Sequence, residues 1–550
     1  MKTIHKLFLI ATIALGLGFV ACNDSEVVSQ GDNDSNANTH VSVTLSLHAK
    51  TRALPDDYND IGKWGGKDKI ETIAVYLVDG SSVTAKVFNV GPGLDYEFTQ
   101  STGQLVPKKE EAAIRTTAGE KKVYVLINGK PEVVTHLNKT PVAEFEDAYQ
   151  KVALKLDNDY TTATPETSAS KIAVKNGVDN ETIVMTNVNP ATLTVLPNIT
   201  AAETIAATPK NRVSLEVERA VARVMVTKEK ETYIIPDPNT DGATNLGTIS
   251  DITWVVAQGE NKLYVQRKSN WNTPSFDWIP TASNYVTQAE DRYDYSGLFE
   301  ERTNKNHGGT DVPHKAAYGK DLGKITAELD AQLSGKFVLP TTHEVATGTA
   351  SSFKKGNTAY VLIRAKFTPE AAAFADGVPY TEGNDFYVGA NGKFYTSAVN
   401  ALLVDKGGVE GQTVARYKDA KVLYYAWLNP DEIPDWYNSP VLRNNIYHIH
   451  ITGFKNLGTN WNPLFPEDPE NPTLIPNPED PTGPQIPSNP DPKPEPDPKF
   501  PTDPTDPDYP EEPTNPIDPE DPLTTPITYM SVDVTVLQWL VHSYNVDLGI

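Results

Sequence analysis

Each end of this 550-residue chain carries a run in which apolar and polar residues alternate. Near the start, the apolar members of the run are Val41, Val43, Leu45 and Leu47. Near the end they are Val532, Val534 and Val536, followed by Trp539 and Val541 and then by Tyr544, Val546, Leu548 and Ile550. Successive side chains of a strand point to opposite faces of a sheet, so each run predicts a strand with one apolar face. Both ends of the chain therefore require a sheet to cover them.

The first run is followed by a sequence that a trypsin-like protease would cut. Lys50-Thr51-Arg52-Ala53 leads into a polar loop that we expect over residues 52–68, and exposed polar loops are preferred sites of proteolysis. We predict cleavage between Arg52 and Ala53. Loss of the first strand would leave a groove in its sheet, and the last strand of a neighbouring copy has the pattern needed to fill it. We therefore interpret the first run as a removable strand and the second as a donor strand.

The donor run changes phase twice, after Val536 and again between Val541 and Tyr544. Each change would move the apolar side chains to the opposite face of the sheet unless the strand bends or bulges there. The sequence thus predicts two strand segments, with one bend near Gln538 and another near His542-Ser543.

The first 22 residues have the pattern of a targeting segment and are excluded from the fold. Lys2 and Lys6 give a basic start, an apolar run covers residues 7–21, and the small residue Ala21 precedes Cys22. The run is short for a membrane span. The pattern is typical of a bacterial lipoprotein signal in which the Cys22 thiol is acylated; an ordinary secretory signal with an incidental cysteine is the alternative. Because Cys22 is the single cysteine of the chain, intramolecular disulfides are excluded.

The negative charge of the chain is concentrated in one segment. The formal net charge of -24 argues against nucleic acid as a partner, because phosphates favour a basic surface. Residues 463–526 contain 16 acidic residues, two lysines and 23 of the 43 prolines. Proline fixes φ and lacks a backbone donor, so neither helix nor sheet can run through this segment. We predict a stiff acidic spacer or a strap around the fold; plain disorder is the alternative.

The remainder of the chain has the pattern of an all-β protein. Strand-like runs occur at 70–78, 123–127 and 183–185, a helix is predicted at 145–156, and a second strand series covers 213–451. Spacing and turn content favour two antiparallel β-sandwich domains with few helices. The predicted divisions are a signal peptide (1–21) before the acylated Cys22, a propeptide (22–52), a first sandwich (53–211), a second sandwich (212–462), the acidic Pro-rich spacer (463–526) and the donor strand (527–550).

The sequence carries no motif that supports catalysis. A Gly-x-Ser-x-Gly elbow, a phosphate-binding glycine loop, a His-Glu-x-x-His pair and a cysteine nucleophile beyond the signal are all missing from it. Carboxylates are plentiful, but the sequence alone pairs no two of them as acid and base. We therefore predict that the chain is not an enzyme and has neither catalytic residues nor a cofactor.

Two short patterns raise the question of a metal site. His448 and His450 alternate on a predicted strand, so both rings would share one face. Two histidines without a third ligand are weak evidence for a zinc site, and such a pair more often lines a solvent face. The segment from Asp237 to Asp241 matches the first half of a calcium loop, yet Thr248 stands where a bidentate glutamate is needed. We favour a plain turn and predict no metal.

Three aromatic residues, Trp427, Trp436 and Tyr437, lie close together in the sequence and are candidates for a sugar-binding platform. Packing in a sheet core is the interpretation that we favour for them. A monomeric glycan-binding surface lipoprotein is accordingly the second functional hypothesis, after the strand-exchanging subunit.

Several motifs, taken in their order along the chain, resemble those of the Bacteroidetes fimbrillin superfamily, specifically the major subunits of the short (minor, Mfa-type) fimbriae. They are the lipoprotein signal at Cys22, the first strand with Lys50-Thr51-Arg52-Ala53, the strand from Val123 to Asn128, the segment from Leu215 to Val224, the segment from Arg443 to Tyr447, and the alternating tail. The resemblance covers nearly the whole chain. The long Pro-rich segment before the tail departs from the family pattern.

The resemblance implies a fold of two transthyretin-like β-sandwiches and an outer-membrane precursor anchored by an acyl chain such as palmitate at Cys22. It also implies that an Arg-specific, gingipain-type protease cuts at Arg52–Ala53, and that the tail of one subunit, within 531–550, enters the vacated groove of the next. Identical subunits would then join head to tail, with accessory anchor and tip subunits, in a surface fimbria. Such fimbriae attach cells to host tissue and to other bacteria and contribute to biofilms and virulence. An accessory, anchor or tip subunit of the same fimbria is a third hypothesis.

Overall fold

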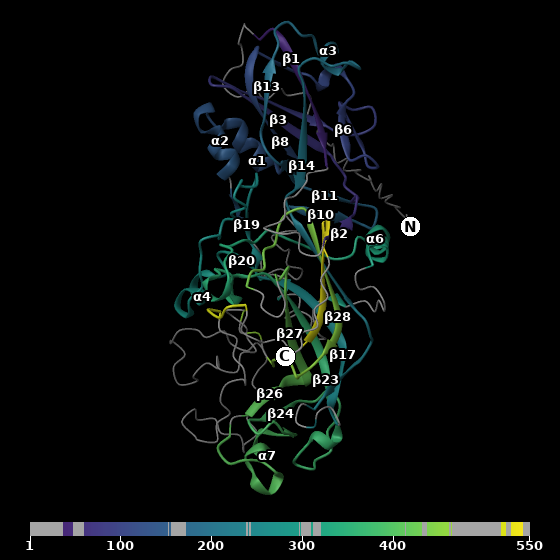
Figure 1. The fold of residues 1–550 in the computed structure, drawn as a ribbon, viewed down its shortest axis with the longest axis vertical. Helices are drawn as coiled ribbons and strands as arrows, with labels where there is room; N and C mark the ends of the chain where they lie inside the picture. Colours follow the sequence, from purple (N-terminus) through teal and green to yellow (C-terminus); the bar gives the residue numbers. More distant parts are fainter. Residues whose placement is uncertain are drawn as a thin grey trace, which may run out of the picture.

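A computed structural model of the chain describes residues 37–47, 60–151, 153–155, 172–237, 240, 244–295, 298, 310–311, 321–412, 414–431, 437–460, 462, 464, 519–523, 530–538 and 540–542. Strands dominate these residues, and the helices are few and short. Figure 1 shows two parts that follow each other along the long axis, an upper part of purple and blue segments and a lower part of teal and green segments. Within the described ranges, no helix is long and apolar enough to cross a membrane.

Ten of the described strands form the sheet of the upper part. Their bounds are β1 (Thr39–Ser46), β3 (Thr72–Val78), β4 (Val83–Asn89), β5 (Tyr96–Thr99), β6 (Gln104–Pro107), β7 (Ile114–Thr116), β8 (Gly119–Ile127), β12 (Met185–Asn187), β13 (Ala191–Val195) and β14 (Arg212–Arg219). Eight of them follow the order β4-β3-β8-β12-β14-β1-β6-β5, while β13 pairs with β8 and β7 pairs with β1. Strand β1 is therefore an interior strand that joins β14 to β6 and β7.

Two helices pack on the upper sheet because their apolar residues recur at helical spacing. They are α1 (Pro131–Lys139) and α2 (Val142–Lys151). Phe145 and Tyr149 lie one turn apart on α2 and are fully buried. The ring of Phe145 lies 5.1 Å from that of Tyr76 on β3, and the Tyr149 hydroxyl donates to the carbonyl oxygen of Val125 on β8 at 2.6 Å. A shorter helix, α3 (Ala201–Ile205), begins with a capping box between Thr200 and Glu203.

The lower part is a sandwich of two larger sheets. One contains, in spatial order, β22 (Lys336–Val338), β15 (Ala222–Lys228), β28 (Asn445–Phe454), β29 (Met530–Gln538), β2 (Asp60–Lys63) and β30 (Leu540–His542). The other contains β16 (Tyr233–Pro236), β17 (Asn245–Ala257), β23 (Tyr360–Pro369) and β27 (Lys421–Trp427), with β21 (Thr310–Asp311) paired to β17. Apolar side chains from both sheets, such as Tyr447 and Ile449 of β28 and Val361 and Ile363 of β23, share one buried cluster between them.

Smaller elements complete the described structure. The short strands are β9 (Ala153–Lys155) with β19 (Lys262–Tyr264), β10 (Ala173–Asn176) with β11 (Asn180–Ile183), β18 (Gly259–Glu260) with β20 (Tyr293–Asp294), and the three strands β25 (Phe394–Tyr395), β24 (Phe386–Gly389) and β26 (Val414–Tyr417). The remaining α-helices are α4 (Ala282–Gln288), α6 (Leu322–Gln332) and α7 (Ala398–Leu402).

The chain passes from the upper sheet to the lower sandwich between β14 and β15. Strand β14 pairs with β1 and β12 in the upper sheet, and β15 pairs with β22 and β28 in the lower one. Only Ala220 and Val221 separate the two strands, and both are fully buried. Residue 212, the predicted start of the second sandwich, is the first residue of β14, which belongs to the upper sheet.

The all-β fold with few helices is confirmed, and three local predictions need correction. The pairs β1–β14 and β15–β28 are parallel, because strands that are distant in sequence need no hairpin between them. The helix predicted at 145–156 ends at Lys151, and residues 153–155 form β9 instead, paired with β19. The polar loop predicted over 52–68 contains β2 and the buried side chain of Trp64.

Candidate functional site

Strand β1 occupies a slot in the upper sheet with partners on both sides. On one side it runs parallel to β14, from Ser42 opposite Arg212 to Ser46 opposite Glu216. On the other side it runs antiparallel first to β7 and then to β6. A strand paired along both edges has its backbone polar groups satisfied within the sheet, so its departure would expose unpaired groups on β14, β6 and β7.

The apolar face of β1 lies in the core of the upper part. Val41 and Val43 are 0% exposed, Leu45 is 1% exposed, and Leu47 packs against the same cluster as a partly buried residue. These are the four residues whose alternation predicted the removable strand. Their alternation matches the period of the strand because one face of β1 meets the core.

Two buried hydroxyl groups also hold β1, one on Thr39 at its first position and one on Ser42, on the face opposite the apolar residues. The Thr39 hydroxyl donates to the carbonyl oxygen of Leu196 at 2.6 Å and accepts from the backbone N–H of Ile199 at 3.1 Å. The Ser42 hydroxyl donates to the carbonyl oxygen of Thr204 on α3 at 2.8 Å and accepts from Nε of Arg212 at 3.1 Å. Both hydroxyl-bearing residues are fully buried. The slot therefore selects small hydroxyl side chains at these two positions.

The predicted cleavage site lies in the connection between the two parts. Residue 47 is the last described residue after β1, and the description resumes at β2, which pairs with β30 and β29 in the lower sandwich. Arg52 and Ala53 fall between these points and, like Cys22, lie outside the described residues. A cut there would separate a strand of the upper sheet from a strand of the lower one.

The predicted donor strand is paired within its own chain. Strand β29 runs antiparallel to β28 over most of its length, from Met530 opposite Phe454 to Val536 opposite Tyr447. On its other side it meets β2 only where Gln538 lies opposite Lys63. In Figure 1 the yellow strand β29 lies beside β28 in the lower part, whereas β1 lies in the upper part. The tail and the slot are thus at different places on the molecule.

The first of the two predicted bends in the tail is confirmed. Strand β29 ends at Gln538, and β30 begins at Leu540 in the opposite direction, parallel to β28. The second predicted bend coincides with the end of β30 at His542. Trp539 and the residues after His542, among them Tyr544, Val546 and Leu548, lie outside the described residues.

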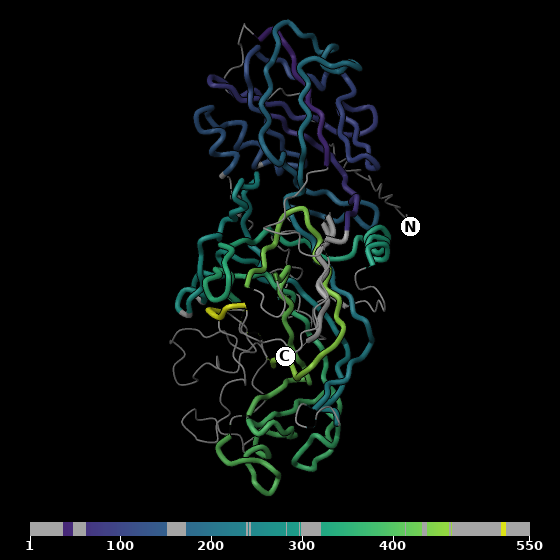
Figure 2. Tube along the Cα trace, in the orientation of Figure 1, coloured from purple at the N-terminus to yellow at the C-terminus, as the bar shows by residue number. Residues whose placement is uncertain are grey.

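Both ends of the Pro-rich segment contact the lower sandwich at one place. Leu464 at its start and Leu523 near its end belong to the same buried cluster as Trp427. Lys355 Nζ binds Asp521 Oδ2 at 3.0 Å, and the N–H of Gly356 donates to the carbonyl oxygen of Pro519 at 2.9 Å. Figure 2 shows the yellow segment 519–523 against the teal segments of the lower part. The tail therefore starts close to the sandwich, whatever the length of the segment before it.

The segments that carried the resemblance meet in buried ion pairs at the junction of the two parts. Arg219 Nε donates to Asp68 Oδ1 at 2.8 Å and its Nη1 to Asn444 Oδ1 at 3.0 Å. The guanidinium group of Arg223, which is 0% exposed, binds the carboxylate of Glu181. These partners could not be predicted from the sequence, because Asp68 and Glu181 come from loops and short strands far from residues 215–224.

A third buried carboxylate lies in the same junction. Arg267 Nε donates to Glu218 Oε1 at 3.0 Å, and Arg443 donates from Nη2 to the carbonyl oxygen of Tyr264 at 3.0 Å. Burial raises the pKa of Glu218, while Arg443 and Arg267 act in the opposite direction. These contacts fix β14 and the start of β28 against the segment 262–267. The segments that resemble the family thus join the two parts of the molecule.

The histidine pair is buried, which corrects the expectation that it lines a solvent face. The Thr227 hydroxyl lies 2.8 Å from Nε2 of His448 and 2.7 Å from Nδ1 of His450. Burial lowers the pKa of His448 to about 3 and that of His450 to about 4. In the described part of the chain, no three His, Cys, Asp or Glu side chains come together as metal ligands would. The pair is therefore a neutral, packed feature of β28 and β15.

The segment that resembles a calcium loop connects two antiparallel strands. Strand β16 ends at Pro236 and β17 begins at Asn245, and Thr248 lies opposite Ile234 within that pair. The position that would supply the last calcium ligand is thus a paired strand residue. Asp241 lies outside the described residues. The hairpin agrees with the plain turn that we favoured.

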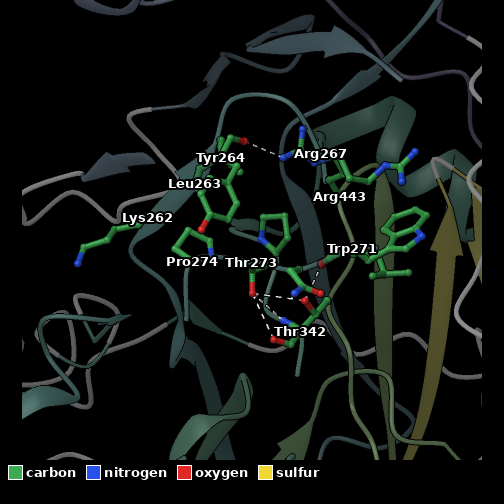
Figure 3. A pocket seen from close by; sticks show the side chains of 12 residues that line it. Lys262, Leu263, Tyr264, Arg267, Trp271, Thr273, Pro274, Thr342 and Arg443 are labelled. Atoms are coloured by element: carbon green, nitrogen blue, oxygen red, sulfur yellow. Dashed lines mark hydrogen bonds between the residues drawn. The ribbon is translucent and has the colours of Figure 1, made fainter. Parts of the chain in front are cut away.

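The aromatic residues proposed for sugar binding do not form an exposed platform among the described residues. Trp427 is buried, with its ring 5.4 Å from that of Tyr360, and Trp436 lies outside the described residues. A separate pocket, drawn in Figure 3, includes Trp271, whose ring lies 3.9 Å from the Arg267 guanidinium. Thr342 donates there to the carbonyl oxygen of Trp271 at 2.7 Å.

Comparisons with known proteins agree on one family. Residues 415–545 match the family model described as "Major fimbrial subunit protein type IV, Fimbrillin, C-terminal". Two proteins called "Minor fimbrium subunit Mfa1", both from Porphyromonas gingivalis, are each 35% identical to the chain over 568 residues and cover 99% of both chains.

Solved structures of fimbrial proteins resemble the chain more distantly. A fimbrilin (fimA) from Porphyromonas gingivalis W83 is 14% identical, with 76% of this chain and 92% of that chain covered and a TM-score of 0.35. The tip fimbrial protein Mfa3 from Porphyromonas gingivalis is 10% identical, with 76% and 96% covered and a TM-score of 0.33.

The identity to the two Mfa1 proteins extends over practically the whole chain, which confirms the resemblance drawn from the motifs. The relatives are structural subunits and not enzymes, as we expected of this chain. The chain is a subunit of a cell-surface fimbria. It belongs to the Mfa-type fimbrillin family of the Bacteroidetes.

Proposed function

We propose that this subunit polymerises by strand exchange after the removal of β1. The precursor is exported as a lipoprotein acylated at Cys22, and an Arg-specific, gingipain-type protease cuts it between Arg52 and Ala53. Strand β1 then leaves the upper sheet, and the tail of a second copy, residues 531–550, enters the slot. The resulting fimbria attaches the cell to host cells and to other bacteria and supports biofilm formation.

The observation that supports this proposal above all is the interior position of β1. Its loss would open the sheet between β14 on one side and β6 and β7 on the other, and would expose the sites of Val41, Val43 and Leu45. Covering apolar sites of this kind stabilises by about 1.5–3 kcal/mol per side chain. Unpaired backbone groups add a further cost, so the open slot strongly favours a replacement strand.

The pairing of the tail favours its transfer to another copy. Strand β29 is paired along one edge with β28 and at a single residue with β2, whereas a strand in the slot is paired along both edges. Transfer would therefore increase backbone pairing. Because the slot and the tail lie at different places, the contact between copies is head to tail and need not close. An open filament follows from this geometry.

Substitution of the cleavage residue tests the proposal. The variant R52A should remain a lipid-anchored, unpolymerised precursor that keeps β1, because the scissile arginine is gone. K50A is the matched control, since it changes a neighbouring basic residue and leaves Arg52 intact, and it should form fimbriae with Ala53 as the N-terminal residue. Cells would be scored by electron microscopy and N-terminal sequencing. Normal fimbriae on R52A cells would contradict the proposal.

A further inference from the structure

The removable strand and the tail share more than the alternation of apolar residues. Residues 39–47 read Thr-His-Val-Ser-Val-Thr-Leu-Ser-Leu, and residues 528–536 read Thr-Tyr-Met-Ser-Val-Asp-Val-Thr-Val. Each segment has apolar residues at its third, fifth, seventh and ninth positions. Each also has a threonine at its first position and a serine at its fourth. These two polar positions of β1 are the fully buried Thr39 and Ser42.

The buried sites of Thr39 and Ser42 demand a hydroxyl group. At the first site the hydroxyl must donate to the carbonyl oxygen of Leu196 and accept from the N–H of Ile199, at 2.6 and 3.1 Å. At the second site it must donate to the carbonyl oxygen of Thr204 at 2.8 Å. A carboxylate cannot donate, and an apolar side chain satisfies neither partner, so a replacement strand without hydroxyls leaves buried polar groups unpaired.

We propose that residues 528–536 of a second copy replace residues 39–47 in the same direction and residue for residue. Thr528 takes the site of Thr39, Ser531 takes the site of Ser42, and Met530, Val532, Val534 and Val536 cover the apolar sites from Val41 to Leu47. Asp533 then takes the half-buried place of Thr44, where a charge can remain hydrated. This inference rests on the proposed function, because it presupposes that a tail enters the slot.

Two other arrangements keep the alternation but place a residue without a hydroxyl at one or both of the buried sites. A shift by two residues, with Val532 in the place of Val41, brings Met530 to the site of Thr39 and Asp533 to the site of Ser42. A strand in the reverse direction brings Gln538 and Thr535 to those two sites. In both cases a larger side chain enters a fully buried site, and in the first case a carboxylate faces the carbonyl oxygen of Thr204.

Cysteine cross-linking distinguishes the three arrangements. Ser46 lies opposite Glu216 of β14, and Glu216 is exposed. The proposed register brings Thr535 to the place of Ser46, the shifted register brings Leu537, and the reversed strand brings Ser531. Adjacent strands are close enough for a disulfide. Cleavage at Arg52 removes Cys22, so in the matured full chain the engineered thiols are the only ones.

Three full-length double variants, E216C/T535C, E216C/L537C and E216C/S531C, would be matured, assembled and mildly oxidised. We expect a covalent ladder of subunits in denaturing gels for E216C/T535C and none for the other two. A ladder from E216C/L537C or E216C/S531C would overturn the register or the direction while strand exchange stands. Filaments without a ladder in any variant would overturn the placement beside β14. If the unsubstituted chain forms no filaments after cleavage, the proposed function itself fails.

A second test asks whether the hydroxyl at position 531 matters. Filaments of S531A should release subunits in urea at least tenfold faster than the unsubstituted filaments, because the carbonyl oxygen of Thr204 and Nε of Arg212 lose their partner. The matched control is T535A, which removes a hydroxyl from a half-buried place on the same face and should change the release rate by less than twofold. Equal release rates for the two variants would contradict the proposed register.

Discussion

Ser42 donates a hydrogen bond from its Oγ to the carbonyl oxygen of Thr204 at 2.8 Å, across 162 residues of the chain. Ser42 precedes the predicted cleavage site, and Thr204 belongs to the segment that stays. A propeptide that merely covered the surface would need no such buried contact. The first strand is thus part of the core of the upper part, and the proposed exchange requires that it be extracted before another strand can enter.

The precursor should depend on β1 for stability in a way that the filament does not. Leu45→Ala should lower the free energy of unfolding of the upper part in the uncleaved precursor by about 2–5 kcal/mol, because it leaves a cavity in the core. Urea unfolding of the precursor would measure the loss. The matched control is Thr44→Ala, at the adjacent half-buried position, with an expected change of less than about 1 kcal/mol. After cleavage and assembly, L45A filaments should match unsubstituted ones, and weaker L45A filaments would contradict the departure of β1.

Acid should weaken the lower sandwich through its two buried histidines. Burial lowers the pKa of His448 to about 3 and that of His450 to about 4, below the ordinary value of 6.5. Between pH 6.5 and 4 the unfolded chain therefore binds more protons than the folded chain. The contribution of the two neutral rings to the free energy of unfolding, which is present above pH 6.5, is lost as the pH falls. The expected loss is roughly 1.4 kcal/mol per pH unit for each ring.

Glutamine and asparagine would keep the contacts to Thr227 without a titrating ring, so H448Q/H450N should flatten this pH dependence. Urea unfolding at pH 7.5 and pH 5 would be compared between this variant and the unsubstituted chain. Burial raises the pKa of Glu260 to about 8, which stabilises the fold as the pH falls through this window. That contribution is common to both proteins and cancels in the difference. An unchanged slope in the double variant would contradict the assignment to the histidines.

The junction between the two parts should depend on the buried pair of Arg223 and Glu181. Glu181→Gln should destabilise the precursor by about 3–5 kcal/mol, because it leaves the buried guanidinium without its carboxylate. The double variant R223M/E181L should recover most of that loss, because both charges are then gone. Thermal unfolding would be followed for both.

An exposed ion pair supplies the control for the junction. Lys69 and Glu71 lie 2.7 Å apart with about half of each side chain exposed, so K69A should cost less than about 1 kcal/mol. A loss for E181Q no greater than that for K69A would show that the Arg223–Glu181 pair does not hold the junction.

Local periodicity revealed the strands but not the pairing of strands that are distant in sequence. The alternation of Val41, Val43 and Leu45 predicted which face of β1 meets the core, and the phase change after Val536 predicted the bend at Gln538. Nothing in those patterns indicates that β1 runs parallel to β14 or that β29 pairs with β28 of its own chain. Such pairings depend on global packing, which a period of two residues does not encode.

The burial of several polar groups likewise could not be predicted from local sequence patterns. His448 and His450 alternate as residues of a solvent-facing strand would, yet Thr227 and burial keep both rings neutral inside the sandwich. Glu181 and Arg223 carry opposite charges but lie 42 residues apart, with no local motif to connect them. A charged or polar residue within a strand pattern is predicted to be exposed unless a buried partner for it is known. Only the three-dimensional fold identifies that partner.

The most direct test of strand exchange is assembly of the chain without its tail. A variant that lacks residues 530–550 keeps the slot of β1 and the cleavage site but has no strand to donate. After cleavage at Arg52, size-exclusion chromatography and electron microscopy should show folded, unassembled protomers from this variant and filaments from the full chain. Filaments of normal length from the truncated protein would contradict the exchange of β1 for the tail of a neighbouring copy.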